Sequence, residues 1–365
     1  MPIADLARAN IRALSPYQSA RRIGGHGHIW LNANEHHSAP AITPGNSPLN
    51  RYPEPQPAAV LDACARYLGV APENLLITRG GDEGIELLIR TFSEPGTGSI
   101  LYNPPTYGMY AVSAATLGLP QKTVPLTAAW QLDLPAIEKA LPGVKILYIC
   151  NPNNPTGTLL HRADLLALLK MTAGRAIVAV DEAYIEYSPA ESLVDALPHY
   201  PHLAIIRTLS KAFALAGLRC GFTLANPELI ALLQKTIAPY PLPGPVADLA
   251  AQALQTDGLR LMRARVATTL AEREHFAAAL RTLPAVKHVE PSGANFLLIH
   301  CHDGPRTFAA LSAAGIITRS QQNALGLADH IVVMHEGRVS ATLAPADFQP
   351  QTLMAAATGQ PHAHA

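Results

Sequence analysis

Cysteine is scarce in this chain of 365 residues, and its spacing excludes several kinds of site. The four cysteines, Cys64, Cys150, Cys220 and Cys301, lie far apart, and no Cys-x-x-Cys pair occurs. Zinc sites and thiol redox motifs are built on closely spaced pairs, so we expect neither. Isolated cysteines in a chain of this length are typical of a reducing compartment.

Long apolar runs are also lacking. No run reaches the roughly 18 residues that indicate a membrane-spanning helix. The first six residues do not have the basic and then apolar layout of a secretion signal. We therefore predict a soluble, cytoplasmic protein with no membrane partner.

Neither sign of charge is in excess, since 27 Lys and Arg residues balance 27 Asp and Glu residues. A nucleic-acid-binding protein would carry a basic surface, so nucleic acid is not an expected partner. Apolar residues make up 48% of the chain, which allows a sizeable core. At this length we expect either one large domain with a smaller one or two domains of comparable size.

From about residue 75 the sequence alternates between two patterns. Short apolar runs that predict buried strands occupy residues 75–78, 99–102, 145–150, 176–180 and 203–206. Between them lie helical patterns, such as residues 163–171 and the i, i+3, i+4, i+7 series Ile85, Leu88, Ile89 and Phe92. This alternation predicts an α/β fold whose mostly parallel sheet is covered by helices on both faces. Ligands bind such sheets at the carboxyl ends of the strands.

Two residues at these predicted strand ends have the chemistry of one cofactor. Asp181 follows the strand at 176–180, and Lys211 follows the strand at 203–206. A lysine that can form an imine and an acid that can hold a pyridinium nitrogen are the two groups that pyridoxal phosphate chemistry requires. Ser210 and Arg219 flank the lysine and suit a phosphate group. The alternative is a solvated lysine and a capping aspartate, which is the usual role of either residue by itself.

Three further segments point to the same kind of site. Gly81 and Asp82 open a predicted helix, whose free N–H groups could bind phosphate, although an ordinary capped turn fits as well. Tyr107 could stack on a planar ring or could simply fill the core. The loop Asn-Pro-Asn-Asn-Pro-Thr-Gly at 151–157 is more specific, and its Asn154 could donate to a phenolate oxygen.

Taken in order, these segments resemble the fold-type I pyridoxal phosphate aminotransferases, and among them the histidinol-phosphate aminotransferases of histidine biosynthesis. The resemblance extends over residues 5–330, in the segments 15–22, 31–35, 50–54, 79–90, 104–110, 153–157, 181–186 and 207–221. It implies a large domain with a mostly parallel central sheet flanked by helices, and a smaller α+β domain. The expected divisions are an N-terminal arm belonging to the small domain (1–30), a large cofactor-binding domain (31–255), a small C-terminal domain (256–326) and an atypical tail (327–365).

The resemblance also implies a role for each matching residue. Lys211 would carry the imine and move the substrate proton, Asp181 would pair with the ring nitrogen, and Tyr184 would join Asn154 at the phenolic oxygen. Tyr107 would stack on the ring. The phosphate group would be held by Gly81, Asp82, Ser210 and Arg219, and by Tyr52 of a neighbouring subunit, which implies a homodimer. The substrate would meet Tyr17, Asn34 and Arg319. No metal is implied.

The reaction that the resemblance implies is reversible amino transfer between L-histidinol phosphate and 2-oxoglutarate. Arginine suits both the phosphate of one substrate and the carboxylate of the other. Two alternatives stay open. One is a related decarboxylase of a phosphorylated amino acid, which would release carbon dioxide. The other is a pyridoxal phosphate-binding protein with weakened catalysis.

The last part of the chain does not follow the family pattern. Family spacing places a second, carboxylate-binding arginine near Val332, whereas the nearest arginine is Arg338. Residues 327–359 instead resemble the end of the ATPase subunit of a sugar-import transporter, although the chain has no GxxxxGK[ST] loop and cannot be that ATPase. We interpret this as a junction near residues 326–329, the alternative being divergence within the family. We then expect the small domain to lack its usual last strand and helix, the cofactor to bind, and transamination with glutamate to be weak.

Overall fold

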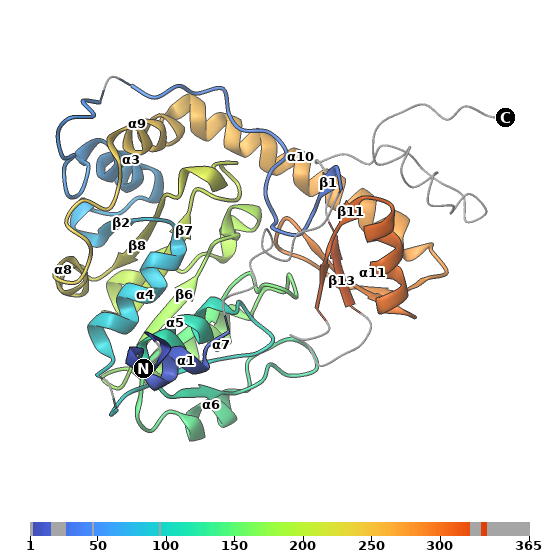
Figure 1. Ribbon diagram of the computed structural model, residues 1–365, viewed down its shortest axis with the longest axis horizontal. Coiled ribbons are helices and arrows are strands. Elements are labelled where there is room, and N and C mark those ends of the chain that lie inside the picture. Colours follow the sequence, from blue (N-terminus) through green and yellow to red (C-terminus); the bar gives the residue numbers. More distant parts are fainter. Residues whose placement is uncertain (1–2, 16–26, 46, 95, 322–329, 334–365) are drawn as a thin grey trace.

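A seven-stranded sheet forms the centre of the computed structural model, which describes residues 3–15, 27–45, 47–94, 96–321 and 330–333 (Figure 1). Its strands are β2 (Leu75–Thr78), β3 (Ser99–Tyr102), β4 (Gln121–Thr123), β5 (Val144–Cys150), β6 (Ile177–Asp181), β7 (Leu203–Thr208) and β8 (Gly221–Ala225). The order across the sheet is β2-β8-β7-β6-β5-β3-β4. Neighbours from β7 to β4 run parallel, and β8 is antiparallel to both β7 and β2. The predicted mostly parallel sheet is confirmed.

The apolar runs form strands because both faces of the sheet are covered. Every residue of β2, β7 and β8 is buried, as expected for strands of a sheet with helices on both faces. At the outer edge, β4 carries Gln121 and Lys122 and is largely exposed. A charged, short edge strand discourages pairing with other chains.

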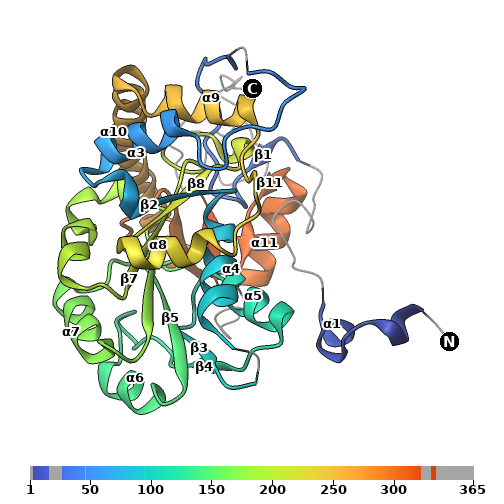
Figure 2. The same cartoon turned by 90° about the vertical axis from the view of Figure 1, so that its left-hand side faces the viewer.

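Two layers of helices provide the cover (Figures 1 and 2). Buried residues of α4 (Gly81–Phe92), α5 (Met109–Leu117) and α8 (Pro227–Gln234) share one apolar core. On the opposite face, a second core is formed with α3 (Ala58–Leu68), α6 (Leu134–Ala140), α7 (Arg162–Thr172) and α9 (Gly244–Ala253). In α4 the predicted helical face is correct, since Ile85, Leu88 and Ile89 are fully buried.

A long helix, α10 (Thr256–Arg281), leads from the large sheet to a smaller one (Figure 1). The small sheet has the order β12-β13-β10-β9. Its elements are β9 (Val286–Val289), β10 (Leu297–Cys301), α11 (Gly304–Ala313), β12 (Arg319–Ser320) and β13 (His330–Val333). Beside it, β1 (Ile29–Trp30) pairs in parallel with β11 (Ile316–Ile317), so the N-terminal arm contributes to this domain.

Strand β13 corrects one expectation. We expected the last strand of the small domain to be missing, but β13 pairs with both β10 and β12 and places Val332 opposite Arg319. Strand pairing uses main-chain groups, and the segment His-Ile-Val-Val is rich in β-branched residues, so it can form a strand whatever family it resembles. The rest of the segment from residue 327 lies outside the described residues, as does the helix expected there.

The short elements complete the described chain. Helix α1 (Ala9–Ala13) lies against α5, where Asn10 Nδ2 donates to the carbonyl oxygen of Ala115 at 2.9 Å. The 3₁₀ helices are η1 (Ile3–Leu6), η2 (Pro72–Asn74), η3 (Ile185–Tyr187), η4 (Pro189–Glu191), η5 (Val194–His199) and η6 (Ala216–Leu218). Within the described ranges, no helix combines the length and the apolar character needed to cross a membrane.

Candidate active site

A cavity of about 470 Å³ lies where β5, β6 and β7 end and α4 begins. It gathers most of the residues that the sequence singled out. The predicted residues that line it are Asn34, Gly81, Asp82, Tyr107, Asn154, Asp181, Tyr184, Ser210, Lys211, Arg219 and Arg319. Tyr52 does not line this cavity, and Tyr17 lies outside the described residues.

Lys211 lies in the loop after β7 and reaches across the cavity. Its Nζ donates to the carbonyl oxygen of Ala33 at 2.7 Å and lies 5.5 Å from the ring centroid of Tyr184. Burial lowers the pKa of Lys211 to about 8, although the carboxylates of Glu35 and Asp82 act in the opposite direction. A lysine with such a pKa has a useful share of neutral, nucleophilic amine near neutral pH.

Asp181, the last residue of β6, is a buried acid with 5% of its surface exposed. Its Oδ2 accepts a hydrogen bond from the hydroxyl of Tyr110 at 2.8 Å, and its Oδ1 accepts one from the backbone N–H of Ala183 at 3.1 Å. Burial raises the pKa of Asp181 to about 6, and these two hydrogen bonds partly offset the rise. Both donors are neutral, so a cationic group in the cavity would find an acid ready to pair with it.

The hydroxyl of Tyr184 receives two amide donors. Asn154 Nδ2 donates to it at 3.2 Å and Asn34 Nδ2 at 3.1 Å. Burial raises the pKa of Tyr184 above its usual value. The other two asparagines of this loop bond to backbone groups instead. Asn151 Oδ1 accepts from the N–H of Leu160, and Asn153 Nδ2 donates to the carbonyl oxygen of Pro105. Asn154 is the asparagine of the loop that lines the cavity.

An anion cradle lies at the other end of the cavity. Ser210 accepts a hydrogen bond from Thr208 at 2.8 Å and one from Arg219 Nη1 at 3.4 Å. Beside them, Gly81 and Asp82 of the first turn of α4 line the cavity, and N–H groups at the start of a helix have no partner within the helix. A hydroxyl, a guanidinium and a helix N-terminus together suit a phosphate group.

The carboxylate of Asp82 organises this cradle. Its Oδ1 accepts from the hydroxyl of Tyr107 at 2.9 Å, and its Oδ2 lies 3.4 Å from Arg219 Nη2. Gly80 permits the close approach of the arginine, because a Cβ atom there would lie 2.9 Å from Arg219 Nη2. Gly80 also has a φ of 78°, which other residues rarely adopt.

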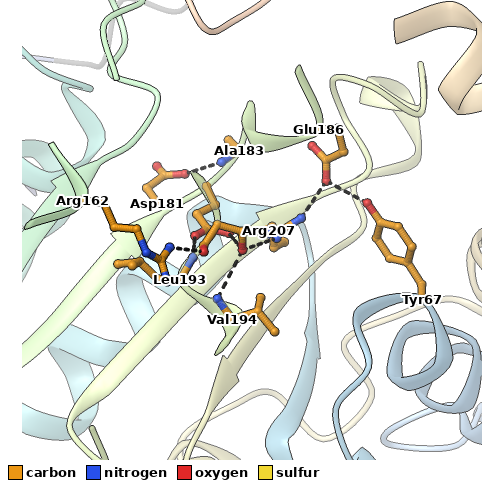
Figure 3. A network of polar contacts seen from close by, with 10 residues as sticks. Tyr67, Arg162, Asp181, Ala183, Glu186, Leu193, Val194 and Arg207 are labelled. Carbon is orange, nitrogen blue, oxygen red and sulfur yellow. Dashed lines mark hydrogen bonds and ion pairs between the residues drawn. The ribbon is translucent and has the colours of Figure 1, made fainter. Parts of the chain in front are cut away.

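A buried ionic cluster supports the segment that follows β6 (Figure 3). Arg207 Nε donates to Glu182 at 2.8 Å, its Nη1 to Glu186 at 3.1 Å, and its Nη2 to the hydroxyl of Ser192 at 3.0 Å. The second oxygen of Glu186 is buried and has no hydrogen-bond partner among the described residues, and burial raises the pKa of this carboxyl. Glu182 and Glu186 flank Tyr184 in sequence but bond to β7 behind the cavity. No sequence motif predicted this cluster.

Sequence reasoning missed several residues of the site itself. Ala33, Glu35, Thr208 and Gln321 line the cavity but were not assigned, and Tyr110 contacts Asp181 from behind. Glu35 could have been noticed, because it directly follows Asn34 in the matching segment 31–35. Ala33, Tyr110 and Thr208 also lie in matching segments, whereas Gln321 lies in none.

A larger hollow of about 980 Å³ lies away from this chemistry, at the ends of α3, α7 and α8. Its charged residues are already paired with each other, since Arg162 and Asp195 lie 2.6 Å apart. Asn74 and Asn226 there bond to backbone groups of their own surroundings. We therefore take the lysine-containing cavity as the candidate active site.

This sheet and this lysine–aspartate site define a class, the fold-type I pyridoxal phosphate enzymes. The sequence profile of the family "Aminotransferase class I and II" matches residues 30–348, and the chain therefore belongs to that family. The match extends past residue 327, into the segment that we expected to be atypical.

Within that family the chain belongs with the histidinol-phosphate aminotransferases. It is 62% identical to "Histidinol-phosphate aminotransferase 1" of Pasteurella multocida over 327 residues, which are 90% of this chain and 93% of the relative. The histidinol-phosphate aminotransferase of Clostridium acetobutylicum has the same fold, with a TM-score of 0.77 at 24% identity over 90% of this chain and 98% of that one. The enzyme from Sinorhizobium meliloti, solved with pyridoxal 5′-phosphate, has a TM-score of 0.76 at 23% identity. The match covers 90% of this chain and 92% of that one.

Proposed function

We propose that this chain catalyses reversible amino transfer between L-histidinol phosphate and 2-oxoglutarate, using pyridoxal 5′-phosphate. The products are imidazole acetol phosphate and glutamate. One observation carries the proposal: Lys211 and Asp181 face the same cavity, with an anion cradle at its far end. The 62% identity to a histidinol-phosphate aminotransferase supports the choice of substrate. No comparable feature favours the decarboxylase.

The residues of the cavity fit the cofactor. Ser210, Arg219 and the N-terminus of α4 suit its phosphate, and the amide of Asn154 with the hydroxyl of Tyr184 suits its phenolic oxygen. Asp181 is a buried acid whose hydrogen bonds come from neutral donors, which matches a protonated ring nitrogen. When bound, the cofactor supplies an electron sink for negative charge at the substrate α-carbon.

Three side chains of the protein have separate roles in the proposed reaction. Lys211 would hold the cofactor, and its amine would take the proton from the substrate α-carbon and return it to the cofactor. A pKa of about 8 suits such a base near neutral pH. Asp181 keeps the ring nitrogen protonated, since an opposite charge favours the charged form. Tyr107 packs against the ring face.

Arg319, Asn34 and Tyr17 are the proposed substrate contacts. Arg319 opens β12 and lines the cavity, where its guanidinium can hold the phosphate of histidinol phosphate. Asn34 is held by Asn295, whose Nδ2 donates to its carbonyl oxygen at 3.0 Å. The role of Tyr17 stays a prediction from the resemblance.

We infer that the active protein is a homodimer located in the cytoplasm. Tyr52 is 82% exposed and stacks on Tyr240 with 4.5 Å between ring centroids, away from the cavity of its own chain. A neighbouring chain could receive this hydroxyl at its cofactor phosphate. Analytical ultracentrifugation tests the assembly, and a Tyr52→Phe variant that binds the cofactor as tightly as wild type would contradict the role. The cytoplasmic assignment rests on the four cysteines, all buried and unpaired.

The experiment that tests the function follows each half-reaction separately. Protein loaded with pyridoxal 5′-phosphate is mixed with histidinol phosphate alone or with glutamate alone, and the cofactor absorbance is recorded. Rapid change with histidinol phosphate supports the proposal, and no change with either donor contradicts it. Histidinol phosphate has no carboxyl group, so the decarboxylase is tested in a separate mixture with a phosphorylated amino acid, where release of carbon dioxide would establish it instead. Lys211→Ala serves as the inactive control.

The same experiment tests the junction near residues 326–329. If the carboxylate-binding arginine is missing, one carboxylate of glutamate has no cationic partner in the site. The loss of such a partner weakens binding by about 2–5 kcal/mol. The half-reaction with glutamate should then be slower by roughly 30-fold to several thousand-fold than that of a typical member of the family. Equally fast reactions with both donors would contradict the junction hypothesis and would direct attention to Arg338.

A further inference from the structure

Tyr110 lies directly behind two residues of the proposed cofactor site. It is fully buried near the start of α5, and its hydroxyl donates to Asp181 Oδ2 at 2.8 Å. Its ring stacks on Tyr148 with centroids 4.8 Å apart and planes 7° from parallel, which fixes the plane of the ring. It also meets Tyr107 edge to face, at 5.8 Å and 85°. Tyr110 therefore touches both the acid and the aromatic wall of the cavity.

The other groups around Asp181 show why this hydrogen bond matters. The negative charges of Asp82 and Glu182 disfavour a third negative charge at Asp181. Cys150, at the end of the neighbouring strand, remains a neutral thiol because burial raises its pKa above its usual value. The groups that favour the ionised form of Asp181 are the Tyr110 hydroxyl and the N–H of Ala183. Tyr110 keeps its proton to donate, because burial and Asp181 raise its own pKa well above normal.

We propose that Tyr110 is a positioning residue of the transamination reaction, and that its hydroxyl keeps Asp181 ionised and oriented toward the ring nitrogen of the cofactor. This inference rests on the proposed function. Hydrogen bonds to a carboxylate favour its charged form, and only the charged form holds a pyridinium proton firmly. Removing the hydroxyl leaves Asp181 with one donor and two acidic neighbours, so the ring nitrogen should lose part of its positive charge.

The test compares Tyr110→Phe with Tyr148→Phe. Each substitution removes one buried tyrosine hydroxyl. That of Tyr148 donates to the carbonyl of Ile85 at 2.8 Å, whereas that of Tyr110 donates to Asp181 and also interacts with the thiol of Cys150. Both proteins are loaded with pyridoxal 5′-phosphate labelled with ¹⁵N in the ring. The ¹⁵N chemical shift reports the ring proton directly, and the pH titration of the visible absorbance reports the ionisation of the lysine nitrogen joined to the ring.

For Tyr110→Phe, we expect the ¹⁵N shift to move toward the unprotonated value. We also expect the absorbance pKa to rise by about one unit, because the hydrogen bond lost is one to a charged group. The value of kcat should fall by about tenfold with a smaller change in KM. Tyr148→Phe should leave both spectroscopic values at those of wild type.

Replacement of Tyr110 by 3-fluorotyrosine supplies a second variant that keeps the shape of the residue. A more acidic phenol is a stronger donor, so both spectroscopic values should move in the opposite direction to those of Tyr110→Phe. This variant decides the question if Tyr110→Phe does not fold. Equal spectra for wild type and the fluorotyrosine protein, or equal shifts in both phenylalanine variants, would overturn the proposal. Failure of wild type to bind pyridoxal 5′-phosphate would instead overturn the proposed function.

Discussion

At the scale of single residues, burial prepares the two reacting groups in opposite ways. It lowers the pKa of Lys211 to about 8 and raises that of Asp181 to about 6, so each group changes its charge much closer to neutral pH than usual. Both effects follow from desolvation, which disfavours charge of either sign. A bound cofactor that bonds to the lysine and presents a cation to the acid removes both penalties.

The lowered pKa of Lys211 leads to a testable prediction about the stability of the protein. Its pKa in the folded protein, about 8, lies below the ordinary value of 10.5. Between these values the unfolded chain holds more protons than the folded one, so the free energy of unfolding rises with pH. In cofactor-free protein we expect wild type to gain stability relative to Lys211→Met as pH increases from 8 toward 10.5. Urea unfolding at several pH values measures this difference. Parallel pH curves for the two proteins would contradict the shifted pKa.

At the scale of elements, the connection between β7 and β8 carries three of the ten proposed cofactor contacts. Ser210, Lys211 and Arg219 all lie in it, and Arg219 adopts a left-handed conformation with a φ of 54°. The sequence interpretation recognised these residues as a motif. It did not show what holds the connection against the start of α4.

Gly221, the first residue of β8, allows the β7–β8 connection to pack closely against the start of α4. This close packing leads to a second prediction. A Cβ atom there would lie 2.7 Å from the carbonyl oxygen of Arg207 and 2.8 Å from the nitrogen of Gly81, both backbone atoms. Gly221→Ala should therefore separate the strand from the anion cradle. We expect it to lower the free energy of unfolding by about 1–3 kcal/mol and to weaken binding of pyridoxal 5′-phosphate.

Gly217 is the matched control for this prediction, because it lies on the other side of Arg219 and a Cβ atom there would meet no atom within 4 Å. Gly217→Ala should bind the cofactor as wild type does. Equal affinities for the two alanine variants, measured by fluorescence titration, would show that the approach at Gly221 is unimportant.

The cluster around Arg207 stabilises the segment that presents Tyr184, and it yields a third prediction. The side chain of Arg207 is 6% exposed and that of its partner Glu182 is fully buried. Arg207→Met would leave two carboxyl groups buried without their cation, which costs about 3–5 kcal/mol. Arg260→Met is the control, since the side chains of its pair with Asp257 are 81% and 90% exposed. Chemical unfolding should separate the two variants clearly, and similar losses would contradict the assignment.

At the scale of the whole molecule, the end of the described chain returns to the site. Strand β13 lies between β12 and β10 and pairs with Arg319 through Val332. The strand that carries the proposed substrate arginine therefore pairs with a strand from the segment that we expected to be atypical. The proposed domain boundaries at residues 255 and 326 stay predictions, although this strand shows that the small sheet continues past 326.

Two truncated chains test this dependence. A chain ending at Gly326 lacks β13, so β12 loses its pairing partner. We expect it to retain cofactor binding in the large domain but to bind histidinol phosphate at least tenfold more weakly. A chain ending at Val333 keeps every described strand and should be less impaired. Equal substrate affinities, measured by calorimetry, would contradict a role for β13. Loss of function in both chains would assign the role to residues 334–365.

The sequence was sufficient where the signal is local. Runs such as 75–78 and 99–102 coincide with β2 and β3 because continuous apolar sequence must be buried on both faces. Lys211 and Asp181 were recognisable because each directly follows a predicted strand, and the ends of parallel strands share one edge of a sheet.

Only the tertiary structure decided the contacts between distant segments. It brings Tyr110 to Asp181 over 71 residues of sequence and the Ala33 carbonyl to Lys211 over 178. It also pairs Val332 with Arg319, although we expected from the sequence that the small domain would lack its last strand. The physical reason is that periodicity records how deeply a segment is buried, whereas hydrogen bonds between segments depend on which elements become neighbours when the chain packs.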